Sequence, residues 1–314
     1  MKVINFNDIR NLNITPLQCV KWVRETFMMQ HKSKLPEKIS MKMDHNIFFN
    51  TMPCIISPIN RLGVKLVSRY PERTPALLSE LLLYEASSGD PLAIMDAEWI
   101  TAMRTGAVAA LAIKTLQKST AHNYAFMGLG NTARATLLCL QSLLENKKIT
   151  VKVLSYKDHA ENFRKRFETF DNIEFIIVDS KEDFINGSDV IVSCVTAADD
   201  LIGKDEWFEE GVLVVPVHTR GFQNCDLFFD KIFVDDTDHV RGFKNFSKFR
   251  HCDEFANVLR RLSVGRTNDK ERILAYNIGI ALHDIYFASK IYEMLKDRNF
   301  IEILGEKELD KFWV

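Results

Sequence analysis

The sequence of 314 residues predicts an α/β protein with two domains: a doubly wound parallel sheet of the Rossmann type and a second domain of α+β structure. Three observations support this prediction. Between residues 123 and 236, runs rich in Val and Ile alternate with helical segments. One apolar run in that region ends in two glycines and turns at once into a helix rich in Ala and Leu. Residues 15–96 instead contain one helix followed by several β-rich runs.

The first part of the chain begins with a predicted helix at residues 15–30, where Thr15 suits the N-cap and Pro16 the first turn. β-rich runs follow at residues 38–43, 46–53 and 62–70, separated by turn residues. Residues 76–96 predict two strands joined by a Ser-Gly-Asp turn. These runs predict an antiparallel sheet. Residues 96–117, with an acidic start and many Ala and Leu residues, predict a long helix.

The second part alternates between the two kinds of element. Strands are expected at residues 123–128, 150–156, 173–178, 189–195, 212–217 and 231–236, with helices at 132–144, 160–169 and 180–186. A last long helix at 277–295 is expected to return to the first domain. We therefore expect residues 1–117 and 276–314 to form a substrate-binding and dimerisation domain, and residues 118–275 a nucleotide-binding Rossmann domain.

Composition narrows the class of partner. The chain has 41 Lys+Arg against 42 Asp+Glu, a formal net charge of -1, so no broad attraction to nucleic acid or to an anionic membrane is expected, and a small-molecule partner fits better. Six scattered cysteines without a C-x-x-C pair predict reduced, mostly buried thiols in a cytoplasmic protein, with no metal site. No stretch approaches the ~18 apolar residues of a membrane span, so a soluble protein is expected.

The glycine pair at Gly128 and Gly130 is the first candidate site. At the end of a strand, Gly128 allows a tight turn, and Gly130 lets the backbone approach a pyrophosphate. Asn131 and Thr132 follow at the start of the next helix, whose N–H groups can bind that pyrophosphate. We place the third small residue of the G-x-G-x-x-[GA] pattern at Arg134 and take the match as imperfect. The position of the pair, on the first strand of a β/α series, still favours a dinucleotide.

The end of the second strand of that series bears on which dinucleotide is bound. An acidic residue there binds the adenosine ribose of NAD, whereas a basic residue favours the 2′-phosphate of NADP. This chain has Ser155, Tyr156 and Lys157 at that place and no acid. Lys157 leans toward NADP, but a solvated surface lysine explains it equally well, so NAD and NADP both stay open.

Two longer segments show a more specific pattern. The block "DPLAIMDAEWITAMRTGAVAALAIKTL", the glycine turn that follows it, and "ERILAYNIGIALHDIYFASKIYE" near the end closely resemble the ornithine cyclodeaminase/mu-crystallin family. The resemblance covers nearly the whole chain, and "ITAMRTGA" is its most specific part. It implies a Rossmann domain that binds NAD(P), together with a dimerisation and substrate domain formed by the N-terminal part and the C-terminal helix.

The resemblance also implies a set of substrate-binding cations. Lys38 occupies the position of a substrate-binding Arg or Lys, Lys65 matches the family lysine, and Arg104 matches the arginine beside substrate and cofactor, with Thr105 next to it. The physics agrees in part, because Lys65 lies in an apolar strand and Arg104 on a helix face of small residues, where each charge needs a partner. The alternative for Lys38 and Arg104 is a surface side chain with its charged end in water.

Departures from the cyclodeaminases decide between activities. The cyclodeaminase aspartate is absent, and His218 and Arg220 stand in that region, while Asn50 replaces a family Glu. His218 could act as acid or base near neutral pH, or simply bind a loop carbonyl. Arg220 would suit a second substrate carboxylate, or an ion pair with Asp199 or Asp200.

Further cofactor contacts are expected from the ends of two other segments. Val195 and Thr196 follow a strand at its carboxyl end, the side on which such folds bind ligands. Asn277 lies where the returning helix is expected to begin, so it either contacts the cofactor or caps that helix.

We therefore expect an NAD(P)-dependent oxidoreductase, a homodimer, that acts on the C–N bond of an amino or imino acid. In one form of this hypothesis the substrate has two carboxylates, and Lys65, His218 and Arg220 are the candidate catalytic residues. Two alternatives stay open: an ammonia lyase of the ornithine cyclodeaminase type, which Arg220 and Asn50 disfavour, and a non-catalytic NAD(P)- and ligand-binding protein like mu-crystallin. Every form of the oxidoreductase hypothesis requires Lys65 and Arg104 to be shielded from open water and their charged ends to lie near the crevice expected between the two domains.

Overall fold

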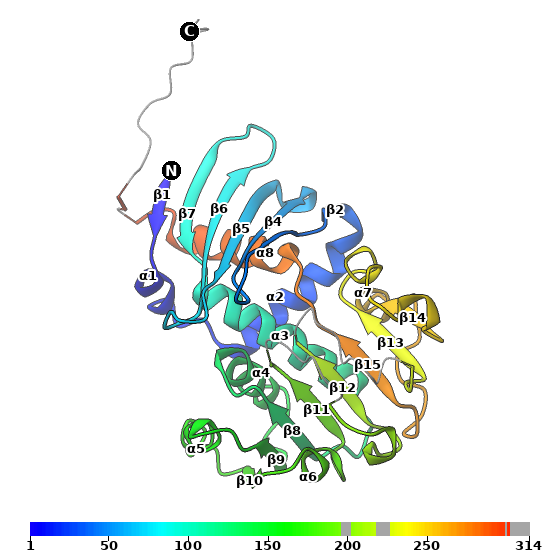
Figure 1. Ribbon diagram of the computed structural model, residues 1–314. Coiled ribbons are helices and arrows are strands. Elements are labelled where there is room, and N and C mark those ends of the chain that lie inside the picture. The colour runs from blue at the N-terminus through cyan, green and yellow to red at the C-terminus, as the bar shows by residue number, and fades with distance from the viewer. Residues whose placement is uncertain (196–201, 218–226, 299, 302–314) are drawn as a thin grey trace, which may run out of the picture. The chain divides into compact units, whose positions relative to one another are not determined.

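A computed structural model describes residues 1–195, 202–217, 227–298 and 300–301, and its chain forms two compact units (Figure 1). The first unit contains Met1–Ile14, His31–Thr101 and the segment that begins at Ala281, and the second contains Thr15–Gln30 and Ala102–Ile280. The second unit thus includes the helix near residue 20 and most of the long helix before residue 117, which the sequence-based division places in the first domain. That division, as a statement about substrate and cofactor domains, stays a prediction.

The first unit is a mainly antiparallel sheet with a helix on one face. Its strand order is β1-β7-β6-β5-β4-β2, with β3 also paired to β4. Among the described strands of this unit, only β1 and β7 pair in parallel. Its strands are β1 (Lys2–Ile4), β2 (Ser33–Lys34), β3 (Ile39–Lys42), β4 (Phe48–Ile56), β5 (Arg61–Arg69), β6 (Leu77–Glu85) and β7 (Pro91–Asp96). Short helices α1 (Phe6–Arg10), η1 (Gln30–Lys32) and η2 (Ser57–Ile59) lie beside these strands in the chain.

Helix α8 (Ala281–Leu295) packs across β4, β5 and β6 (Figure 1). Buried and partly exposed residues alternate along β5, so Gly63, Lys65 and Val67 share the face that α8 covers. A Cβ on Gly63 would lie 2.5 Å from the Cδ1 atom of Ile285, so this glycine permits close contact between helix and strand.

Within its described residues, the second unit contains an eight-stranded sheet in the order β10-β9-β8-β11-β12-β15-β13-β14, in which every pairing is parallel. Its strands are β8 (Asn123–Met127), β9 (Ile149–Leu154), β10 (Ile173–Val178), β11 (Val190–Ser193), β12 (Leu213–Pro216), β13 (Lys231–Val234), β14 (Cys252–Glu254) and β15 (Ile273–Tyr276). The chain runs outward from β8 through β9 to β10, then returns to β11 on the other side. This reversal is the switch point of a doubly wound sheet, which confirms the predicted fold class.

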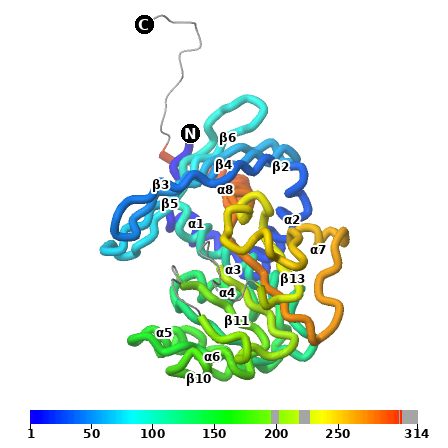
Figure 2. Tube along the Cα trace, turned by 45° about the vertical axis from the view of Figure 1, so that its right-hand side comes forward, coloured from blue at the N-terminus to red at the C-terminus, as the bar shows by residue number. Residues whose placement is uncertain are grey.

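Helices cover this sheet. They are α2 (Pro16–Met29), α3 (Glu98–Leu116, from Ala102 on), α4 (Asn131–Gln141), α5 (His159–Lys165), α6 (Lys181–Ile185), α7 (Phe255–Leu259) and the short η3 (Asp205–Trp207), η4 (Asp238–Val240) and η5 (Phe246–Lys248). A Cβ on Gly106 of α3 would lie 2.5 Å from the backbone nitrogen of Thr136, so α3 and α4 touch backbone to backbone. Helix α2 contacts α4 and α7, and Figure 2 shows it next to α7.

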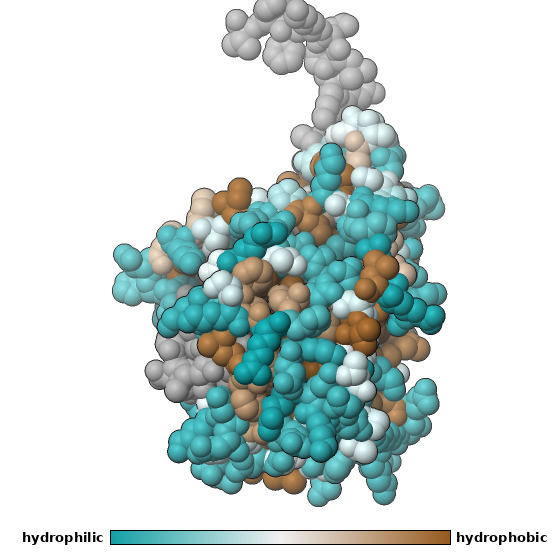
Figure 3. All heavy atoms as spheres, turned by 90° about the vertical axis from the view of Figure 1, so that its right-hand side faces the viewer, coloured by the Kyte–Doolittle hydropathy of each residue, from teal (hydrophilic) through white to brown (hydrophobic). Residues whose placement is uncertain are grey.

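The face of the molecule shown in Figure 3 is mostly hydrophilic, and the described cysteines are free thiols. On the face shown in Figure 3, hydrophilic residues predominate and apolar ones form small separate patches. Within the described residues, no helix combines the length and apolarity that a membrane span requires. The five described cysteines, Cys19, Cys54, Cys139, Cys194 and Cys252, are free thiols, and the first three are buried.

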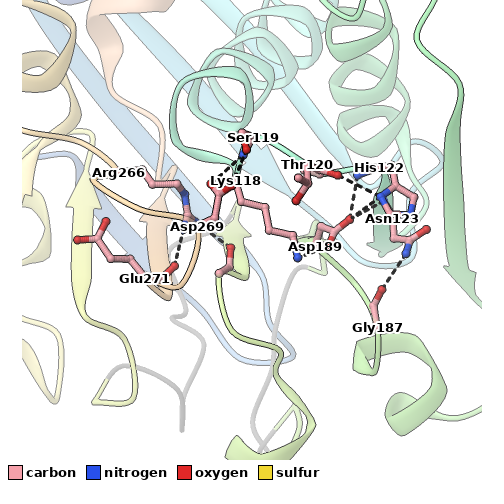
Figure 4. Close-up of polar contacts among 12 residues, drawn as sticks. Lys118, Ser119, Thr120, His122, Asn123, Gly187, Asp189, Arg266, Asp269 and Glu271 are labelled. Atoms are coloured by element: carbon pink, nitrogen blue, oxygen red, sulfur yellow. Dashed lines mark hydrogen bonds and ion pairs between the residues drawn. The ribbon is translucent and has the colours of Figure 1, made fainter.

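The amino ends of the parallel strands are joined by an ionic network (Figure 4). Asp189, just before β11, accepts hydrogen bonds from the backbone N–H groups of His122 and Asn123 at 2.8 and 2.9 Å. Its other oxygen lies 2.7 Å from the Nζ atom of Lys118. Although burial alone would raise the pKa of Asp189, these contacts lower the pKa below its ordinary value.

Candidate functional site

The glycine turn lies at the carboxyl end of β8. Gly128 has φ +75°, and a Cβ there would lie 2.4 Å from the carbonyl carbon of Cys194 and 2.5 Å from the nitrogen of Val195. Glycine is therefore needed both for its left-handed backbone and for the close approach of β8 to the end of β11. By contrast, a Cβ on Gly130 would meet no atom within 4 Å, so this glycine faces open space.

Helix α4 starts directly after this turn. Its N-cap is Gly130, which gives no side-chain hydrogen bond, so the first N–H groups, those of Asn131 and Thr132 among them, have no side-chain cap. Ala133, fully buried, is the sixth residue counted from Gly128 and completes the G-x-G-x-x-A pattern. Placing the third small residue at Arg134 was therefore wrong by one position. An anion fits at this helix terminus, because the free N–H groups and the helix dipole both favour negative charge.

The segment after β9 has no acidic residue through Lys157, as the sequence indicates. Ser155 follows the strand, and Tyr156 is 61% exposed. Lys157 adopts φ +51°, and its Nζ atom lies 5.3 Å from the centre of the Tyr156 ring. An exposed aromatic ring beside a cation at the end of the second strand suits an adenosine group.

In the first unit, Lys65 is buried within the sheet. Its side chain is 1% exposed, and its Nζ atom lies 2.9 Å from the Oδ1 atom of Asp284 on α8, whose side chain is 0% exposed. The partner that the apolar surroundings of Lys65 require is therefore Asp284. Such a pair is costly to bury and is strongly destabilised when one member is removed, which marks it as a candidate for function.

Two other predicted substrate residues lie in this sheet. Asn50 of β4 pairs with Val67 and stands two positions from Met52, the partner of Lys65, so it belongs to the same face. The Oδ1 atom of Asn50 is buried and has no hydrogen-bond partner among the described residues. Lys38 directly precedes β3 and is partly exposed.

Arg104 lies in the part of α3 that belongs to the second unit and is only 5% exposed. Its Nη1 atom would lie 2.6 Å from a Cβ on Gly279, so the guanidinium packs against the backbone after β15. Desolvation is the main reason why the pKa of Asp235 is raised to about 6, and the positive charge of Arg104 limits this rise. Neither Arg104 nor Lys65 faces open water. Thr105, next along the helix, is partly exposed.

Asn277 does not cap the last helix. It follows β15 directly, whereas α8 begins at Ala281, and its Nδ2 atom donates to the Oδ1 atom of Asp235 at 3.1 Å. Val195 lies at the carboxyl end of β11 and touches the glycine turn. Thr196, His218 and Arg220 lie outside the described residues, so their expected roles stay predictions.

Comparison with known proteins shows which family this chain belongs to. The ornithine cyclodeaminase/mu-crystallin family model matches residues 2–299. The chain belongs to this family. Among curated relatives, alanine dehydrogenase of Archaeoglobus fulgidus is 25% identical, with 85% of this chain and 86% of that protein covered. N-((2S)-2-amino-2-carboxyethyl)-L-glutamate dehydrogenase of Staphylococcus aureus is 26% identical, with 70% and 68% covered.

One solved structure is similar to this chain over nearly its whole length. Delta(1)-pyrroline-2-carboxylate reductase of Thermococcus litoralis, in complex with NADH and L-proline, superimposes with a TM-score of 0.85 at 25% identity, over 96% of this chain and all of that one. Homologues in this family are thus NAD(P)-dependent amino- and imino-acid reductases and dehydrogenases. The glycine turn and the uncapped α4 fit such a cofactor, since they provide a space and N–H donors for a pyrophosphate.

Two polar partners in this chain escaped sequence reasoning: Asp235 and Asp284. A signal existed for each. Asp284 is the only acidic residue in the apolar stretch 278–291, and Asp235 follows a buried strand at the edge where ligands bind.

Proposed function

We propose that this protein is an NAD(P)-dependent oxidoreductase that acts on the C–N bond of an amino or imino acid. The observation that supports the proposal most is Lys65, a fully buried cation in an apolar sheet whose Nζ atom lies 2.9 Å from Asp284. Folding alone gives little reason to keep such a pair, because apolar residues of similar volume would be equally stable or more so. A carboxylate ligand that shares the cation gives a reason.

In the proposed mechanism, the residues of this chain bind, orient and neutralise. A bound nicotinamide would supply or accept the hydride. Gly128, Gly130 and the N–H groups at the start of α4 would hold the pyrophosphate. Lys65 and Arg104 bind the substrate carboxylate, and this clamp orients the C–N bond for reaction.

Two parts of the mechanism fall to residues outside the described ranges. His218 takes or gives the proton of the amine, because an imidazole can act as either acid or base near neutral pH. Arg220 binds a second carboxylate through paired N–H donors. The relative from Staphylococcus aureus supports this choice, since its name denotes a glutamate derivative with an added amino-carboxyethyl group.

The protein is further proposed to form a homodimer through its first unit. The sheet face opposite α8 presents apolar residues that are partly exposed, namely Leu62, Val64, Leu66, Leu82 and Ile94. Such a face needs a cover in water, and a second copy provides one by symmetry. The molar mass, measured by light scattering as the protein elutes from a size-exclusion column, tests the dimer directly. A single peak with the mass of one chain would refute it.

The activity is tested by following NADH and NADPH absorbance with three groups of substrate: pyruvate plus ammonia, cyclic ketimines, and 2-oxo diacids plus amines. Oxidation of the cofactor in any group supports the proposal, and the group identifies the substrate class. Release of ammonia from ornithine without net cofactor oxidation would instead indicate a cyclodeaminase. Cofactor binding without turnover in any group would indicate a silent binding protein.

Two variants sharpen this assay. Arg104→Ala should abolish turnover, because the substrate carboxylate loses one cation of the clamp. Arg220→Ala should change the preference between substrates with one and two carboxylates while turnover on the simpler substrate persists. If every kinetic constant were the same in Arg220→Ala, the dicarboxylate form of the proposal would be wrong.

A further inference from the structure

Two neighbouring strand ends bring a carboxylate and an amide together. Strands β13 and β15 pair in parallel with Val234 opposite Tyr276, so the next residues, Asp235 and Asn277, stand side by side at the carboxyl edge of the sheet. The Nδ2 atom of Asn277 donates to Oδ1 of Asp235 at 3.1 Å. The N–H of Gly279 donates to Oδ2 at 2.8 Å. Asp235 therefore fixes the segment that links β15 to the last helix.

Arg104 reaches the same place from α3. A Cβ on Gly279 would lie 2.6 Å from Nη1 and 3.2 Å from Nη2 of Arg104, and Gly279 has φ +79°. Only glycine allows both this backbone and this contact. The guanidinium thus lies against the backbone that Asp235 holds, and its charge lowers the pKa of Asp235. A buried anion, a buried cation and a glycine segment form one cluster within the second unit.

Most of the other polar groups around Asp235 have partners, but the Oε1 atom of Gln30 and the Oδ1 atom of Asn277 are buried and have no hydrogen-bond partner among the described residues. Gln30 donates from Nε2 to the backbone oxygen of Asp235 at 2.9 Å. His239 adds a favourable charge effect on Asp235, but its ring hydrogen-bonds Asp236 at 2.8 Å. Glu254, on the neighbouring strand, accepts from the backbone N–H of Thr237 at 3.1 Å. Among the described residues, Arg104 is therefore the permanently charged cation that bears on the Asp235 carboxylate, and His239 contributes only when it is protonated.

Keeping a charge at this position is costly. Asp235 is 0% exposed, and desolvation is the largest influence on its pKa, which rises to about 6. A neutral amide could accept a hydrogen bond from Gly279 or Asn277 without that cost. A charged Asp235 is explained if its role is to hold the Arg104 cation in one fixed position.

We propose that Asp235 is a positioning residue that, by holding the 277–279 segment, fixes Arg104 at the carboxyl edge of the sheet for cofactor and substrate binding. This inference rests on the proposed function for the role of Arg104. It assigns Asp235 no contact with substrate. Its effect passes through Arg104 and is lost when Arg104 is absent.

A double-mutant cycle on cofactor affinity tests the inference. The dissociation constants of NADH and NADPH are measured by nicotinamide fluorescence for wild type, Asp235→Asn, Arg104→Ala and the double variant. Asp235→Asn should weaken binding about tenfold, or about 1.4 kcal/mol, in the native background and less than about twofold in the Arg104→Ala background. Asp236→Asn, which removes a neighbouring carboxylate bound to His239, is the matched control and should bind as wild type does.

Dependence on pH provides a second readout that a merely structural role would not change. Wild-type affinity should fall as pH drops through about 6, where Asp235 takes up a proton, and Asp235→Asn should show no such fall. His239→Asn should retain it. If Asp235→Asn does not fold, Gly279→Ala takes its place in the experiment. This change displaces Arg104 and leaves Asp235 in place, so it should cause the same loss of cofactor affinity.

The outcomes separate the two proposals. Equal losses in both backgrounds, or no loss in either, would overturn the role of Asp235 even in an active dehydrogenase. Wild-type protein that binds cofactor but turns over no amino or imino acid would overturn the proposed function, while the binding cycle still decides the inference. If wild type binds no cofactor, both proposals fail at that first measurement.

Discussion

Carboxylates at the two ends of the parallel sheet have pKa values shifted in opposite directions. At the amino end, carboxylates have close partners: Glu271 lies 2.9 Å from the Nζ atom of Lys231, and Asp189 lies 2.7 Å from that of Lys118. The pKa values of these carboxylates are below their ordinary range, that of Glu271 at about 2, because the contacts outweigh burial. At the carboxyl end, Asp235 has its pKa raised to about 6, because burial outweighs its contacts.

This difference separates stability from function within one sheet. Charges at the amino end favour the folded state at neutral pH, since the folded protein binds their protons less tightly than the unfolded chain does. The carboxyl end instead has a costly anion, an uncapped helix and an open space at Gly130. Proteins accept such costs at the places where ligands bind. Variants at the two ends should therefore affect different measurements.

The largest effect is expected at Lys65. This residue lies in the first unit and, like Asp235 at the carboxyl end of the parallel sheet, is a buried charge. Lys65→Met should lower turnover roughly a thousandfold, because the substrate carboxylate loses its buried cation. It should also destabilise the fold by about 3–5 kcal/mol, since Asp284 is left as a buried charge. Steady-state kinetics and urea unfolding measure the two effects.

A double variant separates these two consequences. Lys65→Met combined with Asp284→Asn should regain most of the lost stability, because no buried charge is left over, while activity stays low. Turnover close to wild type in either variant would remove Lys65 from the site.

At the amino end, Asp189→Asn should cost roughly 3 kcal/mol of unfolding free energy, because Lys118 loses its ion pair and two backbone N–H groups lose a charged acceptor. Cofactor affinity should stay the same, since this residue lies at the far end of the strands. Urea unfolding and nicotinamide fluorescence measure both properties. A weaker affinity without a change in stability would contradict the division between the two ends.

The glycine turn offers a matched pair of smaller changes. Gly130→Ala places its methyl group in open space at an ordinary φ of -85°, so the fold should be unaffected, but cofactor affinity should fall about tenfold, or about 1.4 kcal/mol. Gly128→Ala should instead lower stability, because its φ is +75° and its methyl group meets the backbone of Val195. Wild-type affinity in Gly130→Ala would argue against a pyrophosphate at this turn.

Most of the fold could be predicted because its signals are local. The Val- and Ile-rich strands, the capping Thr15 and the turn at Gly128 each follow from a few neighbouring residues. β15 was missed, because a four-residue run next to a helix carries little periodicity, and its place between β12 and β13 depends on the whole sheet.

The site could be predicted only in part, for the same reason. Sequence reasoning required a partner for Lys65, yet Asp284 becomes that partner only after α8 packs on β5. Asp235 and Asn277 meet through strand register rather than proximity in the chain. A residue that needs a partner can be recognised locally, whereas the partner is set by tertiary structure.

The smallest predicted effect concerns acid stability at the amino end. The pKa of Glu271 is lowered from 4.5 to about 2, because the effects of Lys231 and Thr267 outweigh burial. Since the folded pKa is depressed, the stabilisation is present above pH 4.5 and is lost as pH falls toward 2. Glu271→Gln should therefore lose about 1 kcal/mol at pH 7, and its stability should fall less than that of wild type between pH 4.5 and 2. Urea unfolding across this range, with Glu174→Gln on exposed β10 as control, measures the difference; identical pH profiles for Glu271→Gln and wild type would place the acid sensitivity of the fold elsewhere.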